Sequence, residues 1–146
     1  PHPMACCRRS SGVSAHVKKE ISSTLGNLKT IFPMTTVIVL ADVSGQILYK
    51  EHPSDVDVAD LVYLMSSMRT TSLDFAQSAV RGSFIPVVHI KGARNMFSMY
   101  DIKGEYSIAF FSAIDALTFE LFDTTKADGQ MSEVVEQLAL VLLNLT

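Results

Sequence analysis

Four histidines are the side chains in this sequence with the clearest chemical potential. They are His2, His16, His52 and His89, and no two of them have the spacing of a metal-ligand pair. Neither a phosphate-binding GxxxxGK[ST] loop nor a GxSxG nucleophile motif occurs. The sequence therefore predicts a protein without catalytic residues, a metal site or a cofactor.

A short acidic cluster has a structural explanation. Asp55, Asp57 and Asp60 lie at the start of a predicted helix that begins near residue 58. Carboxylates at this position cap the free backbone N–H groups and interact favourably with the helix dipole. We expect these aspartates to support the helix rather than to act on a substrate.

The two cysteines are adjacent, at Cys6 and Cys7, and are followed by Arg8 and Arg9. Neighbouring cysteines cannot close a long loop, and a chain without further cysteines has no disulfide framework, which is typical of the reducing cytoplasm. An unmodified tail is one interpretation. The other is S-acylation of both cysteines, because two acyl chains beside basic residues suffice for peripheral membrane attachment.

Length and composition indicate one folded domain. The chain has 146 residues, of which 48% are hydrophobic and 18% charged. We expect residues 13–146 to form this domain and residues 1–12 to be a flexible tail that starts with a cloning remnant, PHP. A net charge of −3 without a basic stripe argues against nucleic-acid binding. The longest apolar runs are far shorter than the roughly 20 residues of a transmembrane helix.

The apolar pattern predicts an α+β fold. Its period changes between the spacing of helices and that of strands, with turn residues between the segments. The predicted elements are helices over 14–32, 58–80 and 132–144 and strands over 35–43, 46–51, 87–91, 96–102 and 106–114. Residues 115–129 fit either a short strand or a helical turn. The five strands would form one antiparallel sheet with the long second helix on one face and the terminal helices on the other or beside it. Pro86 predicts that strand 87–91 lies at the sheet edge.

The long helix carries more apolar surface than one sheet face requires. One stripe has a polar gap at Ser72, and a second stripe runs beside it. The first contains Val58, Leu61, Met65, Met68, Phe75 and Ala79, and the second Val62, Arg69, Leu73, Ala76 and Val80. Either a loop or the first helix of the same chain covers the second side, or a second subunit does.

Residues 35–114 resemble the Roadblock family of dynein light chains and GTPase-linked adaptors, within a wider group that includes longin domains. The resemblance lies in the hairpin VIVLADVSGQILYKE, the long Ala/Met/Leu helix that ends in a glycine, and the meander VVHIKGARNMFSMYDIKGEYSIAFF. It implies the order α-β-β-α-β-β-β-α and a non-enzymatic adaptor or scaffold subunit in the cytoplasm, associated with the cytoskeleton or a membrane. The implied partners are a dynein intermediate chain or a small GTPase.

The resemblance also implies a dimer, either of two identical chains or with a family sibling. Roadblock domains pair through the long helix and the edge strand that follows it. By position, the interface residues implied here are Leu61, Met65, Met68, Ser72, Phe75, Ala79, Val87, His89 and Lys91, with the neighbouring stripe of the helix as the alternative to the first six.

Two other functions remain open at the level of sequence. A longin-like trafficking subunit would use a hydrophobic groove for a partner and need not self-associate. A profilin-like small-molecule sensor would keep an interior cavity lined by the three-stranded meander.

Overall fold

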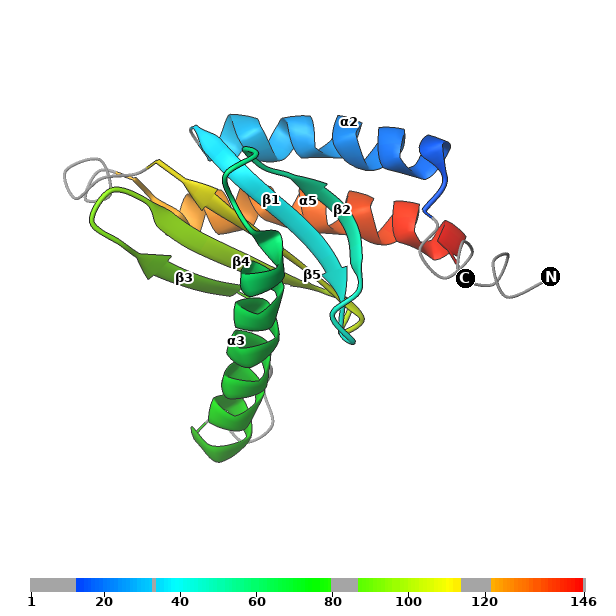
Figure 1. Cartoon of the computed structure of the whole chain (residues 1–146). Coiled ribbons are helices and arrows are strands. Elements are labelled where there is room, and N and C mark those ends of the chain that lie inside the picture. Colours follow the sequence, from blue (N-terminus) through cyan, green and yellow to red (C-terminus); the bar gives the residue numbers. More distant parts are fainter. Residues whose placement is uncertain (1–12, 33, 80–86, 114–121, 146) are drawn as a thin grey trace.

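The computed structural model describes residues 13–32, 34–79, 87–113 and 122–145, with the side chains of 76–79 and 144 excepted (Figure 1). The helices are α2 (Ala15–Ile31), α3 (Val58–Ala79) and α5 (Thr124–Leu142), and a short 3-10 helix, η1 (Leu143–Leu145), follows α5. The strands are β1 (Thr35–Asp42), β2 (Ile47–Glu51), β3 (Val87–Lys91), β4 (Met96–Ile102) and β5 (Tyr106–Ser112). The predicted order of helices and strands is confirmed. The predicted tail with Cys6 and Cys7, and the question of a strand or turn over 115–121, lie outside the described residues.

The five strands form one antiparallel sheet in the order β2-β1-β5-β4-β3. Figure 1 shows α2 and α5 together on one face of this sheet and α3 alone on the other. The predicted α+β class is therefore confirmed, and so is the position of the strand after Pro86 at the sheet edge.

Strand β1 is apolar at nearly every position because it lies between two cores. Ile38 and Leu40 point into the larger core beneath α2 and α5, whereas Val37, Val39 and Ala41 belong to the smaller core beneath α3. Successive side chains of a strand point to opposite faces, so a strand covered on both faces must be apolar on both. The nearly continuous apolar sequence of β1 therefore agrees with its place inside the sheet, between β2 and β5.

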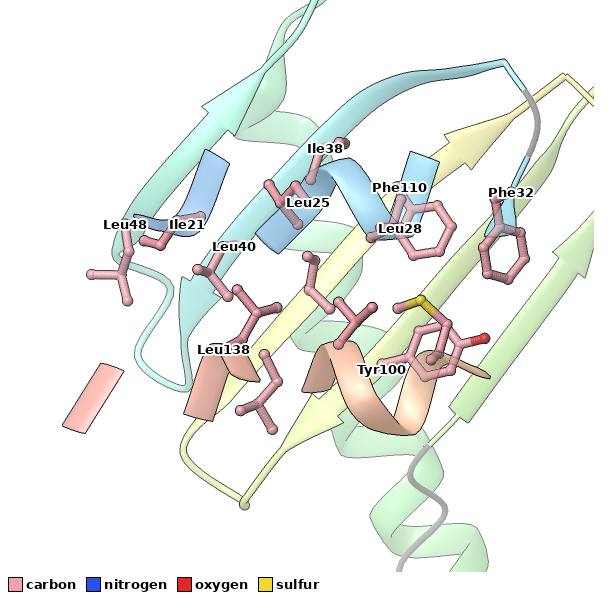
Figure 2. Close-up of a cluster of buried hydrophobic side chains, with 14 of the residues drawn as sticks. Ile21, Leu25, Leu28, Phe32, Ile38, Leu40, Leu48, Tyr100, Phe110 and Leu138 are labelled. Atoms are coloured by element: carbon pink, nitrogen blue, oxygen red, sulfur yellow. The ribbon is translucent and has the colours of Figure 1, made fainter. Parts of the chain in front are cut away.

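Aromatic rings pack together at one end of the larger core (Figure 2). Phe32, at the end of α2, lies with its ring centroid 4.8 Å from that of Phe110 and 5.4 Å from that of Phe122. Leu25 and Leu28 precede it on the same face of α2, and both are fully buried. The spacing of three and four residues thus directs one continuous side of α2 into the core.

The turn between β1 and β2 is held by Asp42. Its Oδ1 accepts hydrogen bonds from the backbone N–H of Ser44 and of Gln46, each at 2.9 Å. Gly45 adopts a positive φ of 95°, which a residue without a Cβ reaches at little cost. The predicted hairpin and its turn are confirmed.

The predicted start of the last helix at Ser132 is wrong, because α5 begins eight residues earlier, at Thr124. Asp123 caps it by accepting a hydrogen bond from the N–H of Lys126 at 3.0 Å. Gly129 lies inside α5, although glycine costs about 1 kcal/mol within a helix. Ala127 and Met131 are buried on either side of it, so packing of this segment on the core outweighs that cost.

Truncation of Phe32 should test the packing of the aromatic rings in the larger core. We expect Phe32→Ala to lower the free energy of unfolding by about 3–5 kcal/mol, because it leaves a cavity among rings that cannot close around it. Met34→Ala is the matched control, since this side chain is 73% exposed and its loss should change stability by no more than about 0.5 kcal/mol. Urea unfolding measures both, and equal effects of the two variants would contradict this account of the core.

Candidate interaction surface on helix α3 and strand β3

Helix α3 is attached to the sheet along one side of its first half. Val58, Leu61 and Met65 are buried in the smaller core, together with Val39 and Met99 of the sheet. At its start, Asp57 Oδ1 accepts a hydrogen bond from the N–H of Ala59 at 2.9 Å, in agreement with the predicted capping role. The inner side of α3 therefore belongs to the fold of the single chain.

Arg69 fixes the middle of α3 to the turn between β4 and β5. Its Nη2 donates to the carbonyl oxygen of Gly104 at 2.9 Å, and its Nη1 lies 3.5 Å from Asp101 Oδ1. Figure 1 shows the later part of α3 projecting past the sheet. The second half of the helix thus extends away from the surface that holds the first half.

One flank of α3 is apolar and open. Leu64, Met68 and Phe75 lie within about 40° of one another around the helix axis, at roughly 100° per residue. Leu64 and Phe75 are exposed, Phe75 by 56% of its surface, and Met68 is partly buried. These three residues are called the α3 flank below.

The α3 flank points towards the β3 side of the sheet. On the opposite side of the helix, Val62 and Ser66 line a small hollow together with Val43 and Gly45 of the β1–β2 turn. Because the strand order runs β2-β1-β5-β4-β3, the side of α3 away from that turn faces β4 and β3. The apolar flank and the free sheet edge therefore lie on the same side of the molecule.

Strand β3 leaves one of its edges open. Within the part of the chain that the structure describes, it pairs only with β4. Val88 belongs to the core beneath α3, and Ile90, two residues on, is 43% exposed on the same face. An open strand edge exposes unpaired backbone groups to which another chain can add.

The nine interface residues implied by the resemblance differ in their exposure in the structure. Leu61, Met65 and Ser72 are buried within the chain itself, so their side chains are not available on the surface of this subunit. Met68 and Phe75 lie on the α3 flank, and the side chain of Ala79 is outside the described residues. In β3, Val87 packs on the larger core and His89 contacts α5, whereas Lys91 is exposed.

The set implied by the resemblance leaves out Leu64, Val88 and Ile90, which lie on this side of the molecule. It contains the stripe through Met65, which is the one that packs on the sheet, and the odd-numbered positions of β3. The alternation Val88, Ile90 was available as a signal, but alternation alone does not say which face of a strand lies beneath which helix.

His89 is the centre of a polar cluster that sequence reasoning did not foresee. Its Nε2 lies 2.8 Å from Asp128 Oδ1 of α5, and its Nδ1 lies 2.8 Å from Ser98 Oγ of β4. Because a carboxylate only accepts, Nε2 donates, and in the neutral ring Nδ1 then accepts from the serine hydroxyl. The Tyr100 hydroxyl donates to the same Asp128 oxygen at 2.6 Å. These bonds join the edge strand β3 to α5.

Serine, histidine and aspartate in contact invite comparison with a catalytic triad, but this arrangement cannot act as one. Ser98 is fully buried, so its hydroxyl cannot reach a substrate carbonyl. Burial raises the pKa of Tyr100, and its hydrogen bond to the Asp128 carboxylate raises it further, so the phenol keeps its proton. The cluster is a structural connection between two elements.

Two further kinds of site are absent from the described residues. These residues contain no group of three or more His, Cys, Asp or Glu side chains that could hold a metal ion. In the same part of the chain, no helix is long and apolar enough to cross a bilayer.

A five-stranded antiparallel sheet between one long helix and a pair of terminal helices defines the architectural class of this domain, and solved structures of the same class exist. Myxococcus xanthus MglB superimposes with a TM-score of 0.72 at 12% identity, covering 92% of this chain and 96% of that one. A structure described as MglB with tetrameric arrangement gives a TM-score of 0.74 at 12% identity, with the same coverage. A Roadblock/LC7 domain from Streptomyces avermitilis gives 0.66 at 13% identity, covering 86% of this chain and 97% of that one.

The chain therefore has the Roadblock/LC7 fold, and the resemblance seen in the sequence is confirmed at this level. No protein-family model matches the sequence, and no curated protein matches it.

The proton held by Tyr100 makes stability depend on pH. Tyrosines of the unfolded chain ionise near pH 10, whereas folded Tyr100 stays neutral, so the folded state holds more protons and loses stability as pH rises above about 10. The Tyr100→Phe variant lacks this hydroxyl. Its free energy of unfolding should therefore fall less steeply with pH, by up to about 1.4 kcal/mol per pH unit. Tyr49 and Tyr106, whose pKa values are also raised, remain in both proteins.

Urea unfolding at about pH 8 and about pH 10.5 would measure this dependence, with Tyr63→Phe as control because Tyr63 is exposed. An identical pH dependence in Tyr100→Phe and in the unsubstituted protein would contradict the assignment.

Proposed function

We propose that this chain is a non-enzymatic adaptor subunit that works as a dimer and links a small-GTPase regulatory complex or a dynein motor to its partners. The observation that carries the proposal is the position of the apolar α3 flank beside the open edge of β3. In this proposal, β3 pairs with the same strand of a second subunit, and the two α3 helices pack across the joined sheet.

The proposed interface revises the set of side chains but keeps the two elements. Leu64, Met68 and Phe75 would contact the partner helix, with Val88 and Ile90 on the same face of the edge strand. Val87, His89 and Lys91 would contribute through their backbone groups, because these make the hydrogen bonds of an added strand. A two-fold arrangement of this kind uses the same surface on both subunits.

The proposed partners rest on the family resemblance and not on a site of this chain. The Roadblock family, which the sequence resembles, contains dynein light chains and GTPase-linked adaptors, so a dynein intermediate chain and a small GTPase are the two partners to test directly. A family sibling in place of the second copy would give a heterodimer with the same geometry. One of the similar structures is described as having a tetrameric arrangement, which supports assembly through exposed surfaces.

A longin-like trafficking subunit is the second candidate. It would use its exposed apolar surface for a peptide or coat partner and need not self-associate. A profilin-like sensor is less favoured, since the meander residues Met96 and Ile108 are packed in the larger core and the hollow that Ile102 lines is a surface groove rather than an interior cavity.

Phe75→Asp should dissociate the dimer without unfolding the chain. A charge in a desolvated contact should weaken association by about 2 kcal/mol or more, which is roughly thirtyfold in Kd. Light scattering across a concentration series should give twice the chain mass of 16.0 kDa for the unsubstituted protein and the single mass for the variant.

Two further variants make this test specific. Leu140→Asp, on the opposite layer and equally exposed at 57%, should stay dimeric. Met65→Asp should unfold the chain, because it places a carboxylate in the buried core beneath α3. A monomeric unsubstituted protein would favour the heterodimer or the longin-like alternative, and a dimeric Phe75→Asp variant would show that the interface lies elsewhere.

Membrane attachment is a separate part of the proposal. Cys6 and Cys7 beside Arg8 and Arg9 fit S-acylation, which would place the adaptor at a membrane surface without a spanning helix. Metabolic labelling with an alkynyl fatty acid would test this, with the Cys6→Ser, Cys7→Ser double variant as control.

A further inference from the structure

An apolar groove lies on the side of α5 that the proposed dimer does not use. It has a volume of about 270 Å³ and is formed by the β4–β5 turn and the last turns of α5. Its apolar lining includes Ile102, Tyr106, Ala139, Leu140 and Leu143. This surface is called the α5 groove below.

Two leucines of the α5 groove are unusually exposed. Leu140 is exposed by 57% and Leu143 by 66% of their surfaces. The exposed apolar side chains Leu64, Phe75 and Ile90 are on the α3 flank and β3, where the proposed dimer would cover them. Met34, Val43 and Tyr63 are also exposed, but each is in a different part of the chain. Dimer formation therefore leaves the leucines of the α5 groove without an explanation.

The rim of the groove carries excess negative charge. Glu136 forms an ion pair with Lys103, with 2.7 Å between Oε1 and Nζ. Glu105 also lines the groove, so two carboxylates face one ammonium group. An occupant with an apolar part and adjacent positive charges would complement this surface.

The chain enters the domain close to this groove. Helices α2 and α5 pack against each other in opposite directions, and Figure 1 shows that α2 starts where α5 ends. Val13, just before α2, and Leu145, just after α5, both pack on the larger core. The four residues 9–12 span about 14 Å when extended, so the segment before them is within reach of the end of α5.

The segment that precedes α2 has an apolar part with adjacent positive charges. Residues 4–7 are Met, Ala, Cys and Cys, and they are followed directly by Arg8 and Arg9. We propose that residues 4–9 dock in the α5 groove of the same subunit. The apolar residues 4–7 cover Leu140 and Leu143, and the two arginines lie beside Glu105 and Glu136. The proposal concerns the tail with free thiols, and it does not depend on the dimer or on the adaptor function.

A spin label on the tail would locate it in the intact chain. Cys6 and Cys7 are the only cysteines in the sequence, so Cys7→Ser leaves a single labelling site at Cys6. We expect a nitroxide at Cys6 to broaden the methyl resonances of Leu140 and Leu143. The resonances of Leu61, in the core on the other face of the sheet, should be unaffected.

Charge exchange tests the specificity of this contact. Replacing both Arg8 and Arg9 by Glu should reduce the broadening about tenfold, and adding Glu105→Lys should restore it. Glu133→Lys is the matched control, because Glu133 lines a different groove, between α2 and α5, and should not restore it. Restoration by both lysine variants would mean that net charge alone governs the effect, which would overturn the proposed contact.

The thiols provide an independent measurement in the unlabelled protein. Docking should slow their reaction with a thiol reagent about tenfold relative to a Leu140→Glu variant, whose fold is checked by circular dichroism. Equal rates together with absent or uniform broadening would overturn the proposal. Broadening seen only between labelled and isotope-enriched chains in a mixture would overturn the same-subunit assignment and place the tail on a second copy.

Discussion

The way the two faces of the sheet are covered governs the rest of the structure. Strands β1 and β5 are apolar on both sides and must be shielded on both. Five strands at about 4.8 Å spacing make a face roughly 20 Å wide, and a packed helix covers about 10 Å of it. The α2–α5 pair therefore covers one face, whereas α3 alone covers about half of the other.

This imbalance gives α3 two roles. Its inner side, through Leu61 and Met65, completes the core of the single chain, and Arg69 attaches it to the β4–β5 turn. Its flank and its projecting half remain available, next to the part of the sheet that it leaves bare. A helix that shields only part of a face creates an apolar surface beside a free strand edge, which is the arrangement that a second subunit can complete.

The polar cluster around His89 gives the edge strand a fixed position. Hydrogen bonds from His89 and Tyr100 to Asp128 connect β3 and β4 to the first turns of α5. An edge strand has backbone partners on only one side, so contacts from its side chains contribute more to its position than they would in the middle of a sheet. In this way the layer of α2 and α5 supports the geometry of the surface on the other side.

Much of the fold could be read from the sequence because its causes are local. They are the apolar residues on both sides of β1, the spacing of four and three residues in α2, the Asp42–Gly45 turn, and Pro86 before β3. Each of these features depends on residues that are close together in the chain. The early start of α5 could not be read, because burial of Ala127 and Met131 against distant residues compensates for Gly129.

The candidate site shows the same division more sharply. The sequence by itself determined that α3 has more apolar surface than one sheet face needs and that β3 is an edge strand. Only the tertiary structure decided that Met65 faces the sheet and Leu64 does not, and that His89 bonds to Asp128, thirty-nine residues away. The physical reason is that amphipathic spacing defines which residues share a face of a helix or strand, whereas long-range packing decides what each face meets.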